Sequence, residues 1–157
     1  MAEDNSKAGI AVQCFCETFN CAQAVFSTFA PDLGLDRERA LKTAAAFGGG
    51  MAHTGATCGA VTGALMAIGL AYGATKADDT DAKKEANRLA GMLMEHFRAR
   101  NFSILCRELL GCDLGTPEGM KFLKEQGLRD RLCAKFVRDA AEILEELLVP
   151  DAEAGSE

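Results

Sequence analysis

The chain has 157 residues and a formal net charge of −6, with 48% hydrophobic and 25% charged residues. This length allows one domain with a sizeable core, and the composition is that of a globular protein, not a disordered one. The acidic balance argues against nucleic acid as a main partner, because phosphate binding needs a basic surface. The first ten residues, MAEDNSKAGI, are polar and acidic. They do not resemble a secretory signal, so we expect a cytoplasmic protein.

Seven cysteines are many for a chain in a reducing compartment, and their odd number leaves one over in a pure disulfide framework. In the cytosol such enrichment indicates metal or redox chemistry more often than structural bridges. The alternative is that the cysteines are small hydrophobic residues that fill a core.

The first predicted helix covers residues 7–19 and follows a frayed end at 1–6. It carries Cys14 and Cys16. On a helix, side chains at positions i and i+2 lie about 200° apart around the axis. These two thiols are therefore badly placed to bind one ion together.

Capping residues define the next two helices. Asn20, with a glutamine three residues later, predicts a capping box and a helix over 21–30. Cys21 then lies in the first turn of that helix. After a Pro-Asp-Leu-Gly turn, Asp36 predicts the start of a helix over 37–47.

The stretch Phe47–Gly73 holds half of the chain's 16 glycines and no formal charge. Three consecutive glycines, 48–50, predict a loop, because glycine is costly in a helix. From Cys58 to Tyr72 the pattern becomes helical, and we expect Thr54 or Thr57 to cap the helix. Cys58 would then lie in the first turn, where the helix dipole favours a thiolate and lowers the pKa.

Small residues four apart, such as Gly59 and Gly63, give this central helix a flat face on which another helix can pack closely. The partner could be a helix of the same chain or a second copy, so a homodimer is possible. The uncharged stretch 54–75 is long enough to cross a bilayer, which takes roughly 20 residues. It has few large apolar residues, so a buried central helix is the simpler interpretation.

The second half of the chain predicts a long helix, two shorter segments and a last helix, followed by a polar tail at 150–157. The long helix covers 81–100. Ser103 is expected to cap a short helix to Leu110, Thr116-Pro117 starts the next segment, and the last helix covers 128–148. No period-two alternation predicts a strand. We therefore expect an all-α, single-domain bundle (1–157, with flexible ends) of about six to seven helices around the central Gly/Ala-rich helix.

The chemistry concentrates in the cysteines, since the chain has no C-x-x-C pair, no H-E-x-x-H motif and no phosphate-binding loop. The two histidines are too few for a histidine-based metal site. His53, five residues before Cys58, could be a ligand or a base that activates the thiol, or simply a polar loop residue.

Four cysteine elements in order give the chain a family resemblance. They are Asn20-Cys21-Ala22-Gln23-Ala24-Val25, Cys58-Gly59-Ala60-Val61-Thr62-Gly63, Cys106-Arg107-Glu108-Leu109-Leu110-Gly111, and Cys133 with Val137 after it. Over roughly residues 8–148 the chain resembles the C_GCAxxG_C_C family of redox-active proteins. Cys14, Cys16 and Cys112 lie outside these four elements, and Cys112 could replace or assist Cys106.

The resemblance implies an all-helical redox or metal-binding protein, with an iron–sulfur cluster as the suspected cofactor and a transporter-associated protein as one possible electron-transfer partner. Its ligands would be Cys21, Cys58, Cys106 and Cys133. Four thiolates also fit a zinc site or two disulfide pairs. Two alternatives stay open: a thiol–disulfide oxidoreductase with Cys58 as nucleophile, and a helical interaction module with structural cysteines and no cofactor. If the chain is an enzyme, we expect an oxidoreductase.

Overall fold

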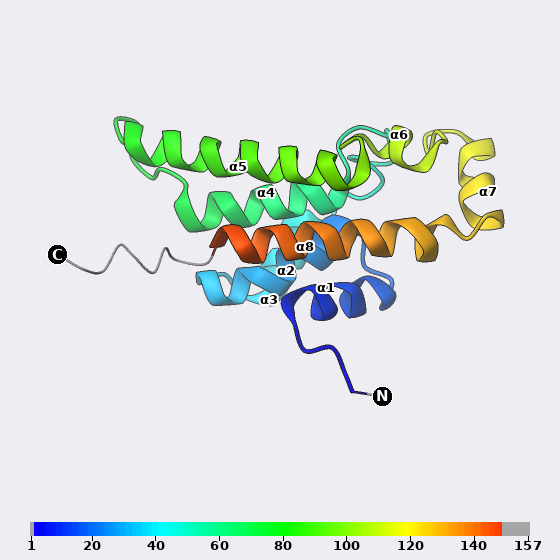
Figure 1. Cartoon of the computed structure of the whole chain (residues 1–157), viewed down its shortest axis with the longest axis horizontal. Helices are drawn as coiled ribbons and strands as arrows, with labels where there is room; N and C mark the ends of the chain where they lie inside the picture. The colour runs from blue at the N-terminus through cyan, green and yellow to red at the C-terminus, as the bar shows by residue number, and fades with distance from the viewer. Residues whose placement is uncertain (1, 149–157) are drawn as a thin grey trace.

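The computed structural model describes residues 2–148, and within that range the chain is helical and has no strand. The all-helical prediction is confirmed (Figure 1). The elements are α1 (Lys7–Cys16), α2 (Cys21–Phe29), α3 (Arg37–Ala44), α4 (Gly59–Tyr72), α5 (Thr80–Asn101), α6 (Cys106–Leu110), α7 (Pro117–Glu125) and α8 (Ala134–Leu148), with a 3-10 turn at Ala30–Leu33 and a π-helical turn at Arg129–Cys133.

The described residues thus contain eight α-helices, more than the six to seven expected, because α6 and α7 both form α-helix. The predicted polar tail at 150–157 lies outside the described residues. Near the other end, in the expected frayed segment, the Asp4 carboxylate forms an ion pair with Arg138 at 2.9 Å.

Helix starts agree with the capping residues in most places. The Asn20 side chain accepts a hydrogen bond from the Gln23 backbone, and the Gln23 side chain accepts one from the Asn20 backbone, so the predicted capping box is confirmed. Asp36 and Thr116 are also N-caps. Helix ends are less well predicted: α1 and α3 each end three residues before the expected limits.

The start of α4 was predicted wrongly. Cys58 is the N-cap residue and not part of the first turn, and neither Thr54 nor Thr57 caps the helix. The Thr54 hydroxyl instead donates to the carbonyl oxygens of Gly50 and Met51 in the preceding loop. The N-cap of α6 is likewise Leu105 and not Ser103. The Ser103 hydroxyl oxygen nevertheless accepts a hydrogen bond from the Leu105 N–H.

Helix α4 is the centre of the bundle and packs against α2, α5 and α8 (Figure 1). Its small face is used for the contact with α2: a Cβ added at Gly63 would lie 2.6 Å from the Ala22 carbonyl oxygen. A backbone atom cannot move aside as a flexible side chain can. The close approach that the spacing of small residues predicted is therefore an internal contact. It places Cys21, beside Ala22, next to the start of α4.

No helix in the described part of the chain is long and apolar enough to cross a membrane. The apolar core lies between α4, α5 and α8, where Ile68, Leu93, Phe97, Ile143 and Leu144 are fully buried. This core holds the helices that carry or border the cysteines in fixed positions.

Candidate functional site: a pocket with four thiols

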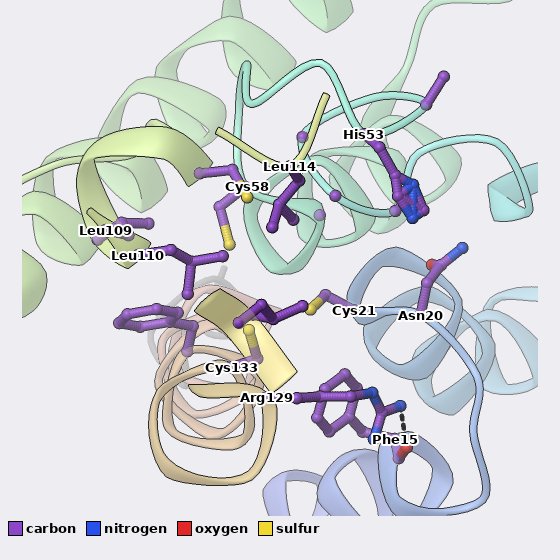
Figure 2. Close-up of a pocket in the computed structure, with 18 of the residues that line it drawn as sticks. Phe15, Asn20, Cys21, His53, Cys58, Leu109, Leu110, Leu114, Arg129 and Cys133 are labelled. Atoms are coloured by element: carbon purple, nitrogen blue, oxygen red, sulfur yellow. Dashed lines mark hydrogen bonds between the residues drawn. The ribbon is translucent and has the colours of Figure 1, made fainter. Parts of the chain in front are cut away.

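One pocket, with a volume of about 210 Å³, brings together cysteines from four parts of the chain. Cys21, Cys58, Cys106 and Cys133 all line it. They come from the starts of α2, α4 and α6 and from the end of the π-helical turn. Figure 2 shows the sulfur atoms of Cys21, Cys58 and Cys133 in this common space.

The main-chain geometry around Cys58 and Cys106 explains how two of these thiols meet. The N–H of Cys58 donates to the Ile104 carbonyl oxygen at 2.7 Å, and the N–H of Cys106 donates to the Ala56 carbonyl oxygen at 2.7 Å. The loop before α4 and the segment before α6 therefore run beside each other in a short antiparallel pairing centred on Thr57 and Leu105. This pairing fixes the separation of the two cysteines.

Each of the four thiols lies close enough to the other three for a charge on one to act on the next. A thiolate at any of the other three cysteines raises the pKa of Cys21. A thiolate at Cys106 or Cys133 also raises the pKa of Cys58, and a thiolate at Cys133 raises the pKa of Cys106. All six pairs of the set therefore interact. The four sulfurs form one electrostatic unit, to which Cys112 is coupled through Cys106 and Cys133.

Burial opposes the predicted lowering of the Cys58 pKa. Removal from water raises the pKa of Cys58 to about 12, although hydrogen bonds from the backbone of Ala60 and Val61 act in the lowering direction. Desolvation penalises a thiolate more than these two N–H groups stabilise it. Burial likewise raises the pKa of Cys106 to about 12. The prediction of an activated Cys58 thiol is therefore wrong for the metal-free protein.

Cys21 and Cys133 form a hydrogen-bonded pair with opposite pKa shifts. The Cys21 thiol donates to the Cys133 sulfur, which raises the pKa of Cys21 well above its usual value and lowers the pKa of Cys133. The Arg129 guanidinium adds to the lowering at Cys133. Within this pair Cys133, beside the cation, therefore loses its proton more readily than Cys21.

Arg129 is a pocket residue that the sequence did not single out. Its guanidinium donates to the carbonyl oxygens of Phe15 (2.8 Å) and Phe19 (3.0 Å) and lies 3.8 Å from the centre of the Phe15 ring (Figure 2). Phe19 is two residues before Cys21, and Cys133 is four residues after Arg129. One side chain therefore connects the segments that carry two of the thiols. Its position one turn before Cys133 is the signal that could have identified it.

The other candidate residues have different surroundings. His53 lines the pocket but is exposed. Cys112 is half-buried and is not among the described residues that line the pocket; burial raises its pKa. Cys14 is buried and Cys16 is exposed, which agrees with their wide separation around the helix.

Within residues 2–148 no group of three or more His, Cys, Asp or Glu side chains is arranged so that it could hold a metal ion. The four thiols line one pocket without forming a single-ion site.

Fold and site together define a class of protein: a helical bundle that gathers four thiols in one largely apolar, partly enclosed pocket. The chain belongs to the C_GCAxxG_C_C family, described as "Putative redox-active protein", whose sequence profile matches residues 19–147. The resemblance given by the four cysteine elements is confirmed. No curated protein and no solved structure matches the chain.

Proposed function

We propose that the four-thiol pocket is the centre of a redox protein and holds an iron–sulfur cluster for electron transfer or redox sensing. One observation carries the proposal: Cys21, Cys58, Cys106 and Cys133, distant along the chain, line the same pocket. A dithiol needs only two of these sulfurs, whereas the common clusters are bound by four cysteines. Ligation of a cluster therefore gives a role to all four.

The donor set fits such a group. Thiolates are the soft ligands that iron–sulfur clusters require, and a cluster distributes its cysteines over more than one iron atom. It therefore does not need three sulfurs to converge on one point, as a zinc site does. The two features support a cluster over zinc in this pocket.

When bound, the cluster would supply reversible one-electron chemistry. The chain's own residues set the conditions for it. The apolar side chains around the sulfurs, among them Leu109, Leu110 and Phe136, restrict water, and Arg129 brings one positive charge to the pocket wall. A low-dielectric site with one cation favours a negatively charged centre more than a purely apolar site would.

The test is to purify the chain without air, or to reconstitute it with iron and sulfide, and to measure iron, sulfide and visible absorbance. We expect stoichiometric iron and sulfide and a coloured protein. Changing any of the four cysteines to serine should abolish loading, whereas Cys16→Ser, at an exposed thiol, should leave it intact. Cys112→Ser decides whether that residue replaces Cys106. Colourless, iron-free protein under these conditions would contradict the proposal.

A second candidate function, thiol–disulfide exchange, is favoured by the hydrogen bond between Cys21 and Cys133. Here the nucleophile is Cys133, in place of Cys58 as predicted from the sequence. The Cys133 thiolate attacks a small disulfide and releases one thiolate. The Cys21 thiol then loses its proton and attacks Cys133 in the mixed disulfide, which releases the second thiolate and leaves a Cys21–Cys133 bond. The protein loses two electrons and the small disulfide gains them.

Incubation of reduced, metal-free protein with oxidised glutathione tests this exchange. We expect mass spectrometry of digests to show a Cys21–Cys133 crosslink that Cys133→Ser prevents and Cys16→Ser does not. If all seven thiols stay free, the exchange function fails. If serine at all four pocket positions changes neither metal content nor the response to oxidant, the cysteines are structural. A redox partner, a transporter-associated one included, and a homodimer remain predictions.

A further inference from the structure

Three consecutive backbone N–H groups in the wall of the four-thiol pocket have no acceptor. Gly48, Gly49 and Gly50 all line the pocket. In the part of the chain that the structure describes, no carbonyl or side-chain oxygen accepts from their N–H groups. The next six N–H groups, from Met51 to Ala56, all donate to backbone carbonyls of the same loop. Between Gly48 and Ala56 the missing partners are therefore those of the three glycines that line the pocket.

Such groups are costly where water is excluded. Gly48 and Gly50 are buried. More than about nine in ten buried backbone N–H groups in proteins have a hydrogen-bond partner. Several unsatisfied donors side by side in a pocket wall indicate a ligand with acceptor atoms.

The loop has the backbone form that collects N–H groups around an anion. Gly48 lies outside the left-handed region, whereas Gly49 and Gly50 have φ angles of 63° and 71°. Residues 48–50 form a turn, and successive backbone N–H groups in such turns can form anion-binding nests. Nests of this kind occur at phosphate and iron–sulfur sites.

The rest of the loop holds this form at a cost. Met51, Ala52 and His53 also have positive φ angles. A non-glycine residue in this conformation is strained, because its Cβ lies too close to the following carbonyl oxygen. The loop is fixed from the other side, because the carbonyl oxygen of Gly50 accepts from the N–H of Ala56 at 2.9 Å. Strain that is retained beside a pocket is typical of functional sites.

The main chain of this loop also lies close to Cys106, one of the four cysteines. A Cβ added at Gly50 would lie 2.8 Å from the Cβ of Cys106 and 2.6 Å from the Ala56 nitrogen. Only glycine brings the main chain this close to the cysteine. No Asp or Glu is among the described residues that line the pocket. The electrostatic character of the wall therefore suits an anion.

We propose that the N–H groups of Gly48, Gly49 and Gly50 bind anionic sulfur, namely the inorganic sulfide of the cluster held by the four cysteines. The inference rests on the proposed function and adds the main-chain half of the site. N–H···S hydrogen bonds stabilise the more negative, reduced state of such a centre and raise its reduction potential.

Residue-resolved amide hydrogen exchange of the full chain, metal-free and loaded with iron and sulfide, tests the proposal. We expect the three glycine amides to exchange at least tenfold more slowly in the loaded protein. The Gly111 amide, which donates to the Arg107 carbonyl oxygen in α6, serves as the internal control and should not change. The variant with serine at all four pocket cysteines, treated identically, should show no slowing.

The His53 amide separates hydrogen bonding from simple exclusion of water. His53 lines the same pocket, but its N–H already donates to the Gly48 carbonyl oxygen at 3.2 Å. Slowing restricted to the three glycines supports sulfide binding, whereas equal slowing at His53 contradicts it. Protein that contains iron and sulfide but has unprotected glycine amides overturns this inference and leaves the proposed function standing. Failure to incorporate iron and sulfide overturns both.

Discussion

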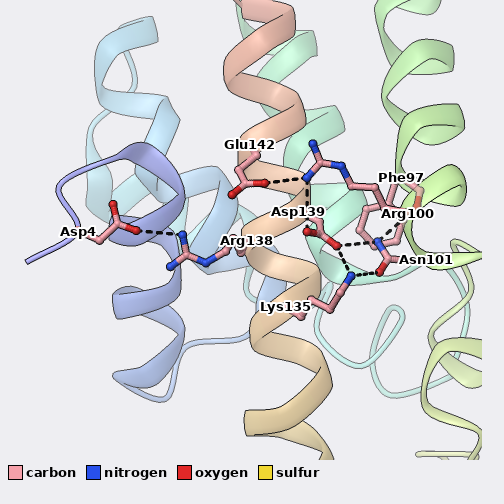
Figure 3. Close-up of polar contacts among 8 residues, drawn as sticks. All are labelled: Asp4, Phe97, Arg100, Asn101, Lys135, Arg138, Asp139 and Glu142. Carbon is pink, nitrogen blue, oxygen red and sulfur yellow. Dashed lines mark hydrogen bonds and ion pairs between the residues drawn. The ribbon is translucent and has the colours of Figure 1, made fainter.

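Two polar regions of the molecule differ in how their charges are balanced. Between α5 and α8, the buried Asp139 carboxylate accepts from Asn101 (3.1 Å) and Lys135 (2.6 Å) and lies 3.5 Å from Arg100, which also pairs with Glu142 at 2.7 Å (Figure 3). Every group in this network has an opposite charge or a hydrogen-bond partner. The four-thiol pocket instead holds interacting thiols, three free amides and the Arg129 cation.

The difference shows what each region is for. A fully paired network stabilises one arrangement of α5 and α8 and leaves no group free to bind anything else. In the pocket the unpaired groups reduce the stability of the empty protein, and a ligand could satisfy them. The network should therefore determine stability, and the pocket should determine the redox chemistry.

The largest effect should come from pH acting on the pocket in reduced, metal-free protein. Thiols of the unfolded chain lose protons near pH 8.5, while Cys58 keeps its proton until about pH 12 in the folded state. Between these values the folded protein binds more protons, so its stability falls as pH rises. The slope approaches about 1.4 kcal/mol per pH unit for this one thiol.

Urea unfolding at a series of pH values from 8 to 10.5 measures this slope. Lysine and tyrosine side chains also titrate in this range, so the comparison is with Cys58→Ala, which lacks the thiol and should show a shallower decline. Parallel curves for the two proteins would mean that the buried thiol does not stay protonated. Asp139→Ala should keep the full slope, because Asp139 is not among the groups that shift the pKa of Cys58.

The second effect concerns the network itself. Asp139→Ala removes the shared acceptor of Asn101, Lys135 and Arg100. Breaking a buried pair by removing one partner costs about 3–5 kcal/mol. Because Lys135 and Arg100 are half-exposed and keep contact with water, we expect about 2–3 kcal/mol by urea unfolding. Loading of iron and sulfide should remain normal in the folded variant.

The control for this variant is Glu145→Ala, at an exposed position on the same helix α8. Its unfolding free energy should stay within about 0.5 kcal/mol of the original. If Asp139→Ala instead abolished loading without loss of stability, the separation of roles between the two regions would be wrong.

Local sequence patterns predicted the helical class and the capping box at Asn20, because these depend on residues near one another in the chain. The family resemblance supplied the four cysteines, and the structure brings them to one pocket. The pKa of Cys58 was predicted with the wrong sign, because its burial depends on α2 and α6, which are remote in sequence. Arg129 and the free amides of Gly48–Gly50 were missed for the same reason, because their surroundings are formed by segments that are remote in sequence.

The smallest expected effect is that of the Arg129 positive charge on the reduction potential. Arg129→Met removes the positive charge beside Cys133 and the hydrogen bonds to the Phe15 and Phe19 carbonyl oxygens. Reduction of either a cluster or a disulfide adds negative charge to the pocket, so the reduction potential should become more negative. A tenfold change in the equilibrium corresponds to about 30 mV for a two-electron couple and about 59 mV for one electron.

The matched variant Arg129→Lys separates charge from geometry. Lysine keeps the charge but lacks the planar fork that bridges two carbonyl oxygens. It should therefore keep most of the reduction potential while losing stability, about 1–2 kcal/mol, similar to the methionine variant. Equal potentials for all three proteins in a redox titration would show that the cation does not act on the centre. Arg129 would then be a structural residue, equivalent to the charges of the Asp139 network.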